Sequence, residues 1–322
     1  MPIGSGAKYV PANLSGTPGD DQWAPMPQID DEKIVLRPNA PQTKVYYSDA
    51  GWTGKNRCGA TGGLLTQVPM PADFVVPHNG ENSSAVFLAS DGRSLIHMQP
   101  FTRCWSGKDA TSLVKFDSVD IYGDGIYGSH GGSRMSAIGG SIRVGELRPG
   151  QPGPKHALKV NVFAKQALFK CNSWNDCYRW PATAADSYAV GHYGTNGGNS
   201  NSNMKMGALL AIPASVDLSK LGLETQPAKQ LAWTFQNYGG YVVDDTYGPA
   251  FALNAEQGPD GSVRDQFKSD WGFDFEQRVI NNTPWSRDMQ RLVKALNVVS
   301  NNSSSNIGGG GTPRQPLAPA FK

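Results

Sequence analysis

The chain has 322 residues and a formal net charge of +2, and only 17% of its residues are charged, whereas its 38 glycines and 23 prolines favour turns over long helices. This charge gives no extended basic surface for nucleic acid, and no run of about 20 apolar residues indicates a transmembrane helix. We therefore expect neither a nucleic-acid partner nor a membrane partner. Polarity that comes mostly from Asn, Ser, Thr and Gln suits an extracellular β protein.

The first 30 residues are rich in Pro and Gly and show no hydrophobic periodicity, so residues 1–30 are expected to form an extended arm over the domain. Short β-branched or aromatic runs bounded by turn residues follow, and these indicate strands. Asp91-Gly92 lies between two such runs and is typical of a hairpin turn. The strands predicted up to residue 116 are 33–36, 43–47, 85–88, 94–98 and 113–116.

Four cysteines, Cys58, Cys104, Cys171 and Cys177, allow three disulfide pairings. The last two flank a short loop that a disulfide could close, and Cys58–Cys104 would then be the second bridge. No C-x-x-C or Cys/His zinc spacing occurs, which lowers the expectation of a metal site. We expect disulfides and an oxidising compartment, with buried free thiols as the alternative.

A glycine-rich run over residues 117–146 carries acidic, basic and aromatic residues on a backbone that can turn tightly. Residues 123–128 match G-x-G-x-x-G, but no helix start follows, which argues against a dinucleotide site. Asp120 and Asp124 could ligate calcium, although Asp residues in such turns commonly cap the turn instead. His130 is predicted to lie on an exposed loop and is a candidate substrate-binding residue.

Aromatic residues after Cys177 suggest a platform for a sugar ring. Trp180 and Tyr193 are the main candidates, and Trp105 is a third. His156 opens a strand-like run and is expected at the rim of a cleft as a candidate catalytic residue, where it and Arg143 would orient the substrate or stabilise charge. The alternatives are a Trp packed on the Cys171–Cys177 loop and a His bonded to a backbone carbonyl.

Paired acids end an apolar strand at Asp244 and Asp245, the position at which a glycosidase can hold a catalytic carboxyl group. Adjacent residues on a strand point to opposite faces, so only one of the two is expected to face a given cleft. The partner carboxyl group would then come from elsewhere, and Asp186 is our candidate. The alternative is an acidic turn that merely ends the strand.

Two helices are predicted, near 226–238 and 286–299, from capping residues and apolar stripes at helical spacing. Further strands are expected at 141–144, 157–164, 208–212, 240–243 and 250–254. Residues 301–322 form a Gly/Pro-rich tail. The predicted fold is mainly β, an antiparallel β-sandwich or jelly-roll-like single domain over residues 31–300 with about two packed helices.

Several segments resemble secreted bacterial β-rich proteins of extracellular and polysaccharide-degrading repertoires, a group to which no activity is attached. The segments are SAIGGSIRVGEL, HALKVNVFAK, YRWPATAADSYA and LAWTFQNYGGYVVDD, within residues 85–255. The resemblance implies secretion and a β-rich fold, and it points to a carbohydrate substrate.

These observations lead us to expect a secreted enzyme that acts on a polysaccharide or oligosaccharide, with a glycoside hydrolase favoured. Asp186 and Asp244 would be the acid/base pair and Asp245 the substitute. A polysaccharide lyase that uses His156, Tyr193 and Arg143 is one alternative. A non-catalytic glycan-binding, structural or filament-forming protein is another, since the Gly/Pro-rich ends suit self-association.

Overall fold

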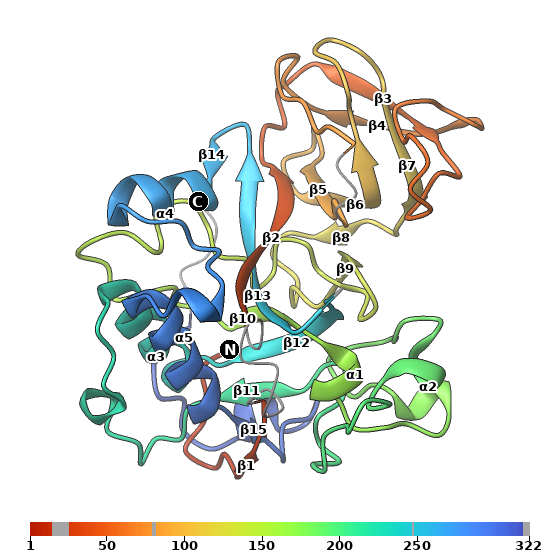
Figure 1. Cartoon of the computed structure of the whole chain (residues 1–322). Coiled ribbons are helices and arrows are strands. Elements are labelled where there is room, and N and C mark those ends of the chain that lie inside the picture. Colours follow the sequence, from red (N-terminus) through yellow and green to blue (C-terminus); the bar gives the residue numbers. More distant parts are fainter. Residues whose placement is uncertain (15–25, 79–81, 247, 318–322) are drawn as a thin grey trace.

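The computed structural model describes residues 1–14, 26–78, 82–246 and 248–317 of the chain (Figure 1). The predicted mainly β class with packed helices is confirmed. Fourteen strands pair in one large mixed sheet, in the order β1-β15-β11-β12-β10-β13-β2-β5-β6-β7-β3-β4, with β14 and β8 beside this path. A sandwich or jelly roll is not confirmed, because the described strands follow one continuous pairing path.

The strands, in chain order, are β1 (Tyr9–Pro11), β2 (Met26–Val35), β3 (Gln42–Tyr47), β4 (Leu64–Pro69), β5 (Ala85–Leu88), β6 (Ser94–Thr102), β7 (Ala110–Lys115), β8 (Val119–Asp120), β9 (Tyr127–His130), β10 (Leu158–Val162), β11 (Leu209–Ala211), β12 (Gly240–Asp245), β13 (Ala250–Gly258), β14 (Gly261–Ser262) and β15 (Asn297–Val299). The helices are α1 (Ala164–Ala167), α2 (Ala189–His192), α3 (Gln226–Asn237), α4 (Val263–Trp271) and α5 (Pro284–Ala295). Among the described residues, no helix combines the length and apolar character that crossing a bilayer requires.

Strand β2 joins two halves of the sheet. Its first part pairs in parallel with β13 and its last part pairs in parallel with β5. Strands β3 to β7 form a separate lobe, visible at the upper right of Figure 1, with its own apolar core around Val45, Phe87 and Phe101. The larger core packs α3 and α5 against β10, β12 and β13. The lobe and the larger body therefore meet along β2.

The two predicted helices are present with changed bounds, while the short helices α1 and α2 and the longer α4 were not predicted. The helix near 226–238 is α3. The second begins earlier than predicted, because Thr283 caps it and Pro284 occupies its first turn, and it ends before β15, which pairs with β1. The unpredicted α4 is capped by the Ser262 side chain and ends at Gly272, whose φ is +78°.

Both described chain ends are integrated into the body. Residues 1–14 include β1, at one end of the sheet, and Gly4 packs so closely on Gly310 that a Cβ at Gly4 would lie 1.9 Å from the Gly310 carbonyl oxygen. Residues 26–30 belong to β2 in the middle of the sheet. Residues 15–25 of the predicted arm and residues 318–322 of the predicted tail lie outside the described residues.

Both disulfides are present, as predicted. Cys58–Cys104 joins the loop after β3 to the loop after β6, and Cys171–Cys177 closes a six-residue separation in the larger body. Such bonds are typical of oxidising compartments.

Strand β2 carries four consecutive charged residues, 30–33, in the middle of the sheet, and three of them, Asp31, Glu32 and Lys33, are buried. Successive side chains on a strand point to opposite faces. On one face, the Glu32 carboxylate lies 2.9 Å from the Lys159 ammonium and also contacts His130. On the other face, Asp31 pairs with Arg264. Glu32 and Asp31 are thus each held by a cation, and Asp30 accepts a hydrogen bond from Nδ2 of Asn161 at 2.8 Å, which lets a charged strand occupy the sheet centre.

We predict that Glu32→Gln lowers the free energy of unfolding by about 3–5 kcal/mol, because it leaves the buried Lys159 ammonium without its carboxylate partner. Denaturant unfolding at pH 7 measures this loss. Asp120→Asn is the matched control, since it removes an ion pair with Arg93 at an exposed site and should change stability little. Equal stabilities of the two variants would contradict the assigned role of Glu32.

Candidate active site

A cleft of about 610 Å³ lies between the β3–β7 lobe and the larger body. The lobe contributes one wall, the turn after β9 contributes the floor, and the loop after η1 (Trp174–Asp176) together with the end of β12 contributes the opposite wall. The polar and aromatic side chains that line it are Trp52, Asn82, Gln99, Arg134, Trp174, Asp186, Ser187, Tyr188, Asp244 and Asp245. The three predicted carboxyl groups therefore share one cleft.

The dipeptide Gly131-Gly132 allows two of these carboxyl groups to approach each other. A Cβ built on Gly131 would lie 1.8 Å from Oδ2 of Asp244, and one on Gly132 would lie 2.7 Å from Oδ2 of Asp186. Gly131 also has φ +25°, which favours glycine. Both carboxyl groups consequently pack on one glycine pair of the glycine-rich run, and any larger residue there would displace them.

Asp244 is held at the end of β12 by three donors. Its carboxyl group accepts hydrogen bonds from the Gly132 amide at 3.2 Å, from the Asp245 amide at 2.9 Å and from Nδ2 of Asn82 at 2.9 Å. Burial and the neighbouring Asp186 charge outweigh these donors and raise the pKa of Asp244 to about 8. Asp244 therefore holds a proton at neutral pH although it is well supplied with donors.

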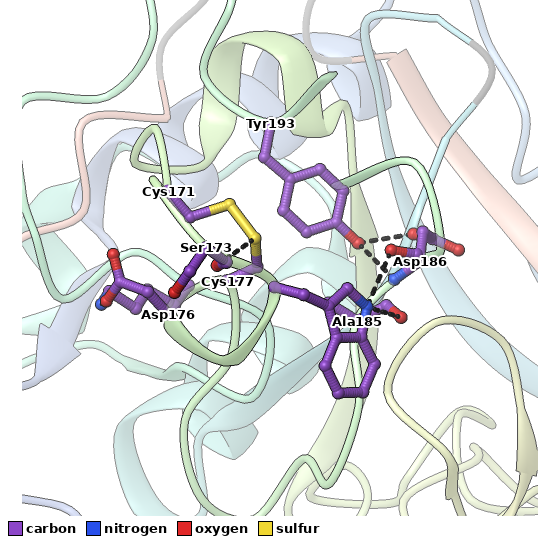
Figure 2. The surroundings of a disulfide bond; sticks show 9 residues. Cys171, Ser173, Asp176, Cys177, Ala185, Asp186 and Tyr193 are labelled. Atoms are coloured by element: carbon purple, nitrogen blue, oxygen red, sulfur yellow. Dashed lines mark hydrogen bonds and ion pairs between the residues drawn. A yellow bond between two sulfur atoms is a disulfide. The ribbon is translucent and has the colours of Figure 1, made fainter. Parts of the chain in front are cut away.

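Asp186 is positioned by two aromatic residues (Figure 2). The Tyr193 hydroxyl donates a hydrogen bond to its carboxylate, while Nε1 of Trp174 lies 3.2 Å from the backbone carbonyl oxygens of Ala185 and of Asp186 itself. Trp174 belongs to the loop closed by Cys171–Cys177. Burial raises the pKa of Asp186, and the Tyr193 hydrogen bond opposes this rise. The disulfide loop thus fixes the backbone that carries Asp186.

Asp245 faces different neighbours from Asp244, as expected of adjacent strand residues, yet it also borders the cleft because the strand ends there. Its carboxylate accepts a hydrogen bond from the Ala164 amide at 2.8 Å and lies 2.8 Å from Nε2 of His192. Burial raises the pKa of Asp245 to about 6. The prediction that only one of the two acids faces the cleft was therefore wrong, since both Asp244 and Asp245 line it.

His130 lies beneath the acids and not on an exposed loop, because β9 carries it into the interior, where it is 0% exposed. Its Nδ1 contacts the Glu32 carboxylate, and its Nε2 lies 3.8 Å from Oδ2 of Asp244. Burial lowers the pKa of His130, but the Glu32 charge overcomes this and raises it. For Glu32 the effects are opposite in sign: burial raises the pKa of its carboxyl group, but Lys159 and His130 lower it to about 2. His130 is therefore a buried support for Asp244.

Asp30, His130 and Asp244 present one ligand atom each within 4.8 Å of one another, so this group could hold a metal ion. The Lys159 ammonium already balances part of the carboxylate charge. The His130 ring balances more of it, because its raised pKa favours the protonated form. The charge of the cluster therefore does not by itself require a metal, and nothing identifies a particular ion.

The predicted calcium ligands Asp120 and Asp124 are engaged in turns. The Asp120 carboxylate accepts a hydrogen bond from the Tyr122 amide and pairs with Arg93, and the Asp124 carboxylate accepts one from the Ile126 amide. These are the turn-capping contacts that we considered as the alternative to a calcium site.

The aromatic residues at the cleft differ from those predicted. Trp52, Trp174 and Tyr188 line it with 50%, 38% and 51% of their surfaces exposed. Tyr193 is fully buried and reaches the site only through its hydroxyl group. Trp105 is exposed beside the Cys58–Cys104 disulfide but does not line this cleft.

His156 and Trp180 line a second cavity of about 450 Å³ that lies apart from the three acids. His156 is paired there with Glu146 at 2.9 Å, and Arg143 forms a two-bond pair with Glu256, whose oxygens lie 2.8 and 3.0 Å from its guanidinium nitrogens. The candidates His156, Trp180 and Arg143 are therefore not brought together with Asp186 and Asp244. Pairing with Glu146 and Glu256 explains the placement of His156 and Arg143, respectively.

Two non-glycine residues at or next to the cleft have positive φ angles. Ser83, next to Asn82, has φ +47°, and Arg134 has φ +56°, although neither is a glycine. Non-glycine residues in this region are uncommon and cluster at functional sites.

Comparisons with protein-family profiles, with curated proteins and with solved structures find no match for this chain.

We predict that Asp244→Asn flattens the dependence of stability on pH between pH 6 and 8. The native state keeps the Asp244 proton up to about pH 8, whereas the unfolded state releases it near its ordinary value of 3.8, so stability falls as the pH rises through this window. Removing one such proton should reduce the slope by about 1.4 kcal/mol per pH unit. Denaturant unfolding at several pH values measures it.

The control is Asp274→Asn, which removes an exposed pair with Lys268 and should leave the slope as in the wild type. An unchanged slope in Asp244→Asn would mean that Asp244 is ionised throughout this pH range.

Proposed function

We propose that this protein is a secreted glycoside hydrolase that cleaves a neutral glycan in the cleft between the β3–β7 lobe and the larger body. The observation that carries the proposal is the packing of Asp186 and Asp244 on one Gly-Gly dipeptide in a cleft bordered by exposed aromatic rings. Glycosidases use two carboxyl groups that flank the scissile bond, one protonated and one ionised.

The environments of the two acids suggest which role each plays. Asp244, whose pKa is raised to about 8, would donate its proton to the leaving glycosidic oxygen. Asp186, whose carboxylate accepts the Tyr193 hydrogen bond, would act as the base toward water or as the nucleophile. His130 pairs with Glu32 through Nδ1, while its Nε2 lies 3.3 Å from Oδ1 of Asn161 and 3.8 Å from Oδ2 of Asp244, so the ring packs against the acid from the protein interior.

Exposed aromatic rings would supply the sugar subsites. Trp52 stands on the lobe side of the cleft, and Trp174 and Tyr188 stand on the opposite wall. An aromatic face gains apolar contact with the C–H side of a pyranose ring, while nearby polar groups bond its hydroxyl groups. A sugar chain bound between these walls would pass over the Gly131-Gly132 floor.

The charges of the cleft favour a neutral glycan over a uronate. Among the described residues that line it, three carboxyl groups face one guanidinium group, that of Arg134. A polysaccharide lyase would need to neutralise a uronate carboxylate, and the groups proposed for it, His156 and Arg143, have carboxylate partners of their own elsewhere. The lyase is therefore the weaker candidate, and glycan binding without cleavage is an outcome of the tests below.

An extracellular location belongs to the same proposal. Two disulfides and the resemblance to secreted bacterial proteins support it.

We predict that the wild-type protein releases reducing ends from a neutral polysaccharide, and that Asp186→Asn lowers kcat about 10³-fold because the base or nucleophile is lost. A panel of neutral and uronate-containing polysaccharides, assayed for reducing ends and for unsaturated products, measures this. Asp274→Asn serves as the control and should keep full activity. Unsaturated products, or glycan binding with no cleavage anywhere in the panel, would contradict the hydrolase.

A second prediction separates the two roles. An aryl glycoside with a strongly acidic phenol as leaving group needs little protonation, so Asp244→Asn should retain much of its activity on that substrate while losing it on the natural glycosidic bond. Asp186→Asn should be inactive on both. Initial rates over a pH series measure this, and the wild-type rate on the glycan should fall above about pH 8 as Asp244 ionises. The reverse pattern would exchange the two assignments.

A further inference from the structure

Among the described residues that line the cleft, Gln99 carries a buried donor without a partner. Gln99 lies on β6, lines the cleft from the lobe side and is only 3% exposed. Its Nε2 makes no hydrogen bond to any of the described residues. A buried polar group without a partner destabilises the folded protein, so such groups are rare and call for an explanation.

No acceptor among the described residues competes with a ligand for the Gln99 amide. Its backbone is fixed by the pairing of β6 with β7, where Gln99 lies opposite Val114. Asn82, the neighbouring polar residue on this wall, already donates its Nδ2 to Asp244. Because the Asn82 donor is engaged, Gln99 carries the unpartnered side-chain amide among the described residues of this wall.

The ring most suited to share a ligand with Gln99 is Trp52, which lines the same lobe wall and is half exposed. An apolar ring face and one fixed donor together match a sugar, which has an apolar C–H face and acceptor oxygens around its rim. The three carboxyl groups across the cleft accept hydrogen bonds when ionised, so they would bond sugar hydroxyl protons, whereas Gln99 would bond an oxygen lone pair.

We propose that Gln99 is a specificity-determining residue that donates a hydrogen bond from Nε2 to an acceptor oxygen, a hydroxyl or an N-acyl carbonyl, of the sugar bound against Trp52. This inference rests on the proposed hydrolase and deepens it. A site built around a buried donor discriminates strongly against a substrate that lacks the matching oxygen, because the donor then stays unpaired.

Gln99→Leu tests the inference, with two readouts. On the polysaccharide cleaved fastest by the wild type, kcat/KM should fall about tenfold or more, chiefly through KM, because a hydrogen bond to bound sugar is lost. In denaturant unfolding without glycan, the variant should be as stable as the wild type or more stable, since an unpaired donor has been removed. A structural glutamine would give the opposite pair of results.

Two further variants sharpen the test. Gln67→Leu, at an exposed position on β4 outside the cleft, is the matched control and should leave kcat/KM unchanged. Gln99→Glu keeps the size of the side chain but replaces the amide donor with a buried carboxylate in a cleft that already holds three carboxyl groups, so its kcat/KM should fall further than that of Gln99→Leu.

The outcomes distinguish this inference from the proposed function. Cleavage by the wild type together with an unchanged kcat/KM in Gln99→Leu would overturn the role of Gln99 and leave the hydrolase standing. A wild-type protein that neither cleaves nor binds any glycan of the panel would overturn both.

Discussion

The burial of charge on strand β2 is the constraint on which the rest of the structure depends. A strand with four consecutive charged residues can occupy the centre of a sheet only if each face supplies partners. Lys159 and His130 supply them on the face that bears Glu32, and the same contact directs His130 toward Asp244. The ion pairs that join the two halves of the sheet therefore also form the base of the candidate site.

Above this base, the site depends on a second constraint, the space that two glycines leave. Gly131 and Gly132 admit the carboxyl groups of Asp244 and Asp186, which come from a strand end and from a loop more than fifty residues earlier. The loop is fixed by Trp174 and the Cys171–Cys177 disulfide, and the strand is fixed by the sheet. Two acids from separate elements thus converge without a dedicated catalytic motif, and burial makes at least one of them hold its proton.

The sequence was informative where a feature depends on residues close to one another in the chain. An apolar strand that ends in paired acids predicted Asp244 and Asp245, and the spacing of Cys171 and Cys177 predicted their disulfide. The sequence was misleading where the position of a side chain depends on its partner. His156 forms an ion pair with Glu146, which no local pattern indicates. The charges of β2 and the sheet order depend on contacts between distant segments. Two local signals were overlooked: the capping residues Ser262 and Gly272 of α4, and the alternation within residues 30–33, which places Asp30 and Glu32 on a single face.

The charge of Asp186 helps to raise the pKa of Asp244, and titration of the Asp244 carboxyl group measures this interaction. In protein labelled with ¹³C at the aspartate carboxyl carbons, the Asp244 signal should titrate near pH 8 in the wild type. In Asp186→Asn it should titrate at lower pH, because the neighbouring negative charge has been removed. An Asp244 signal that titrates near its ordinary value of 3.8, with no response to Asp186→Asn, would contradict the account.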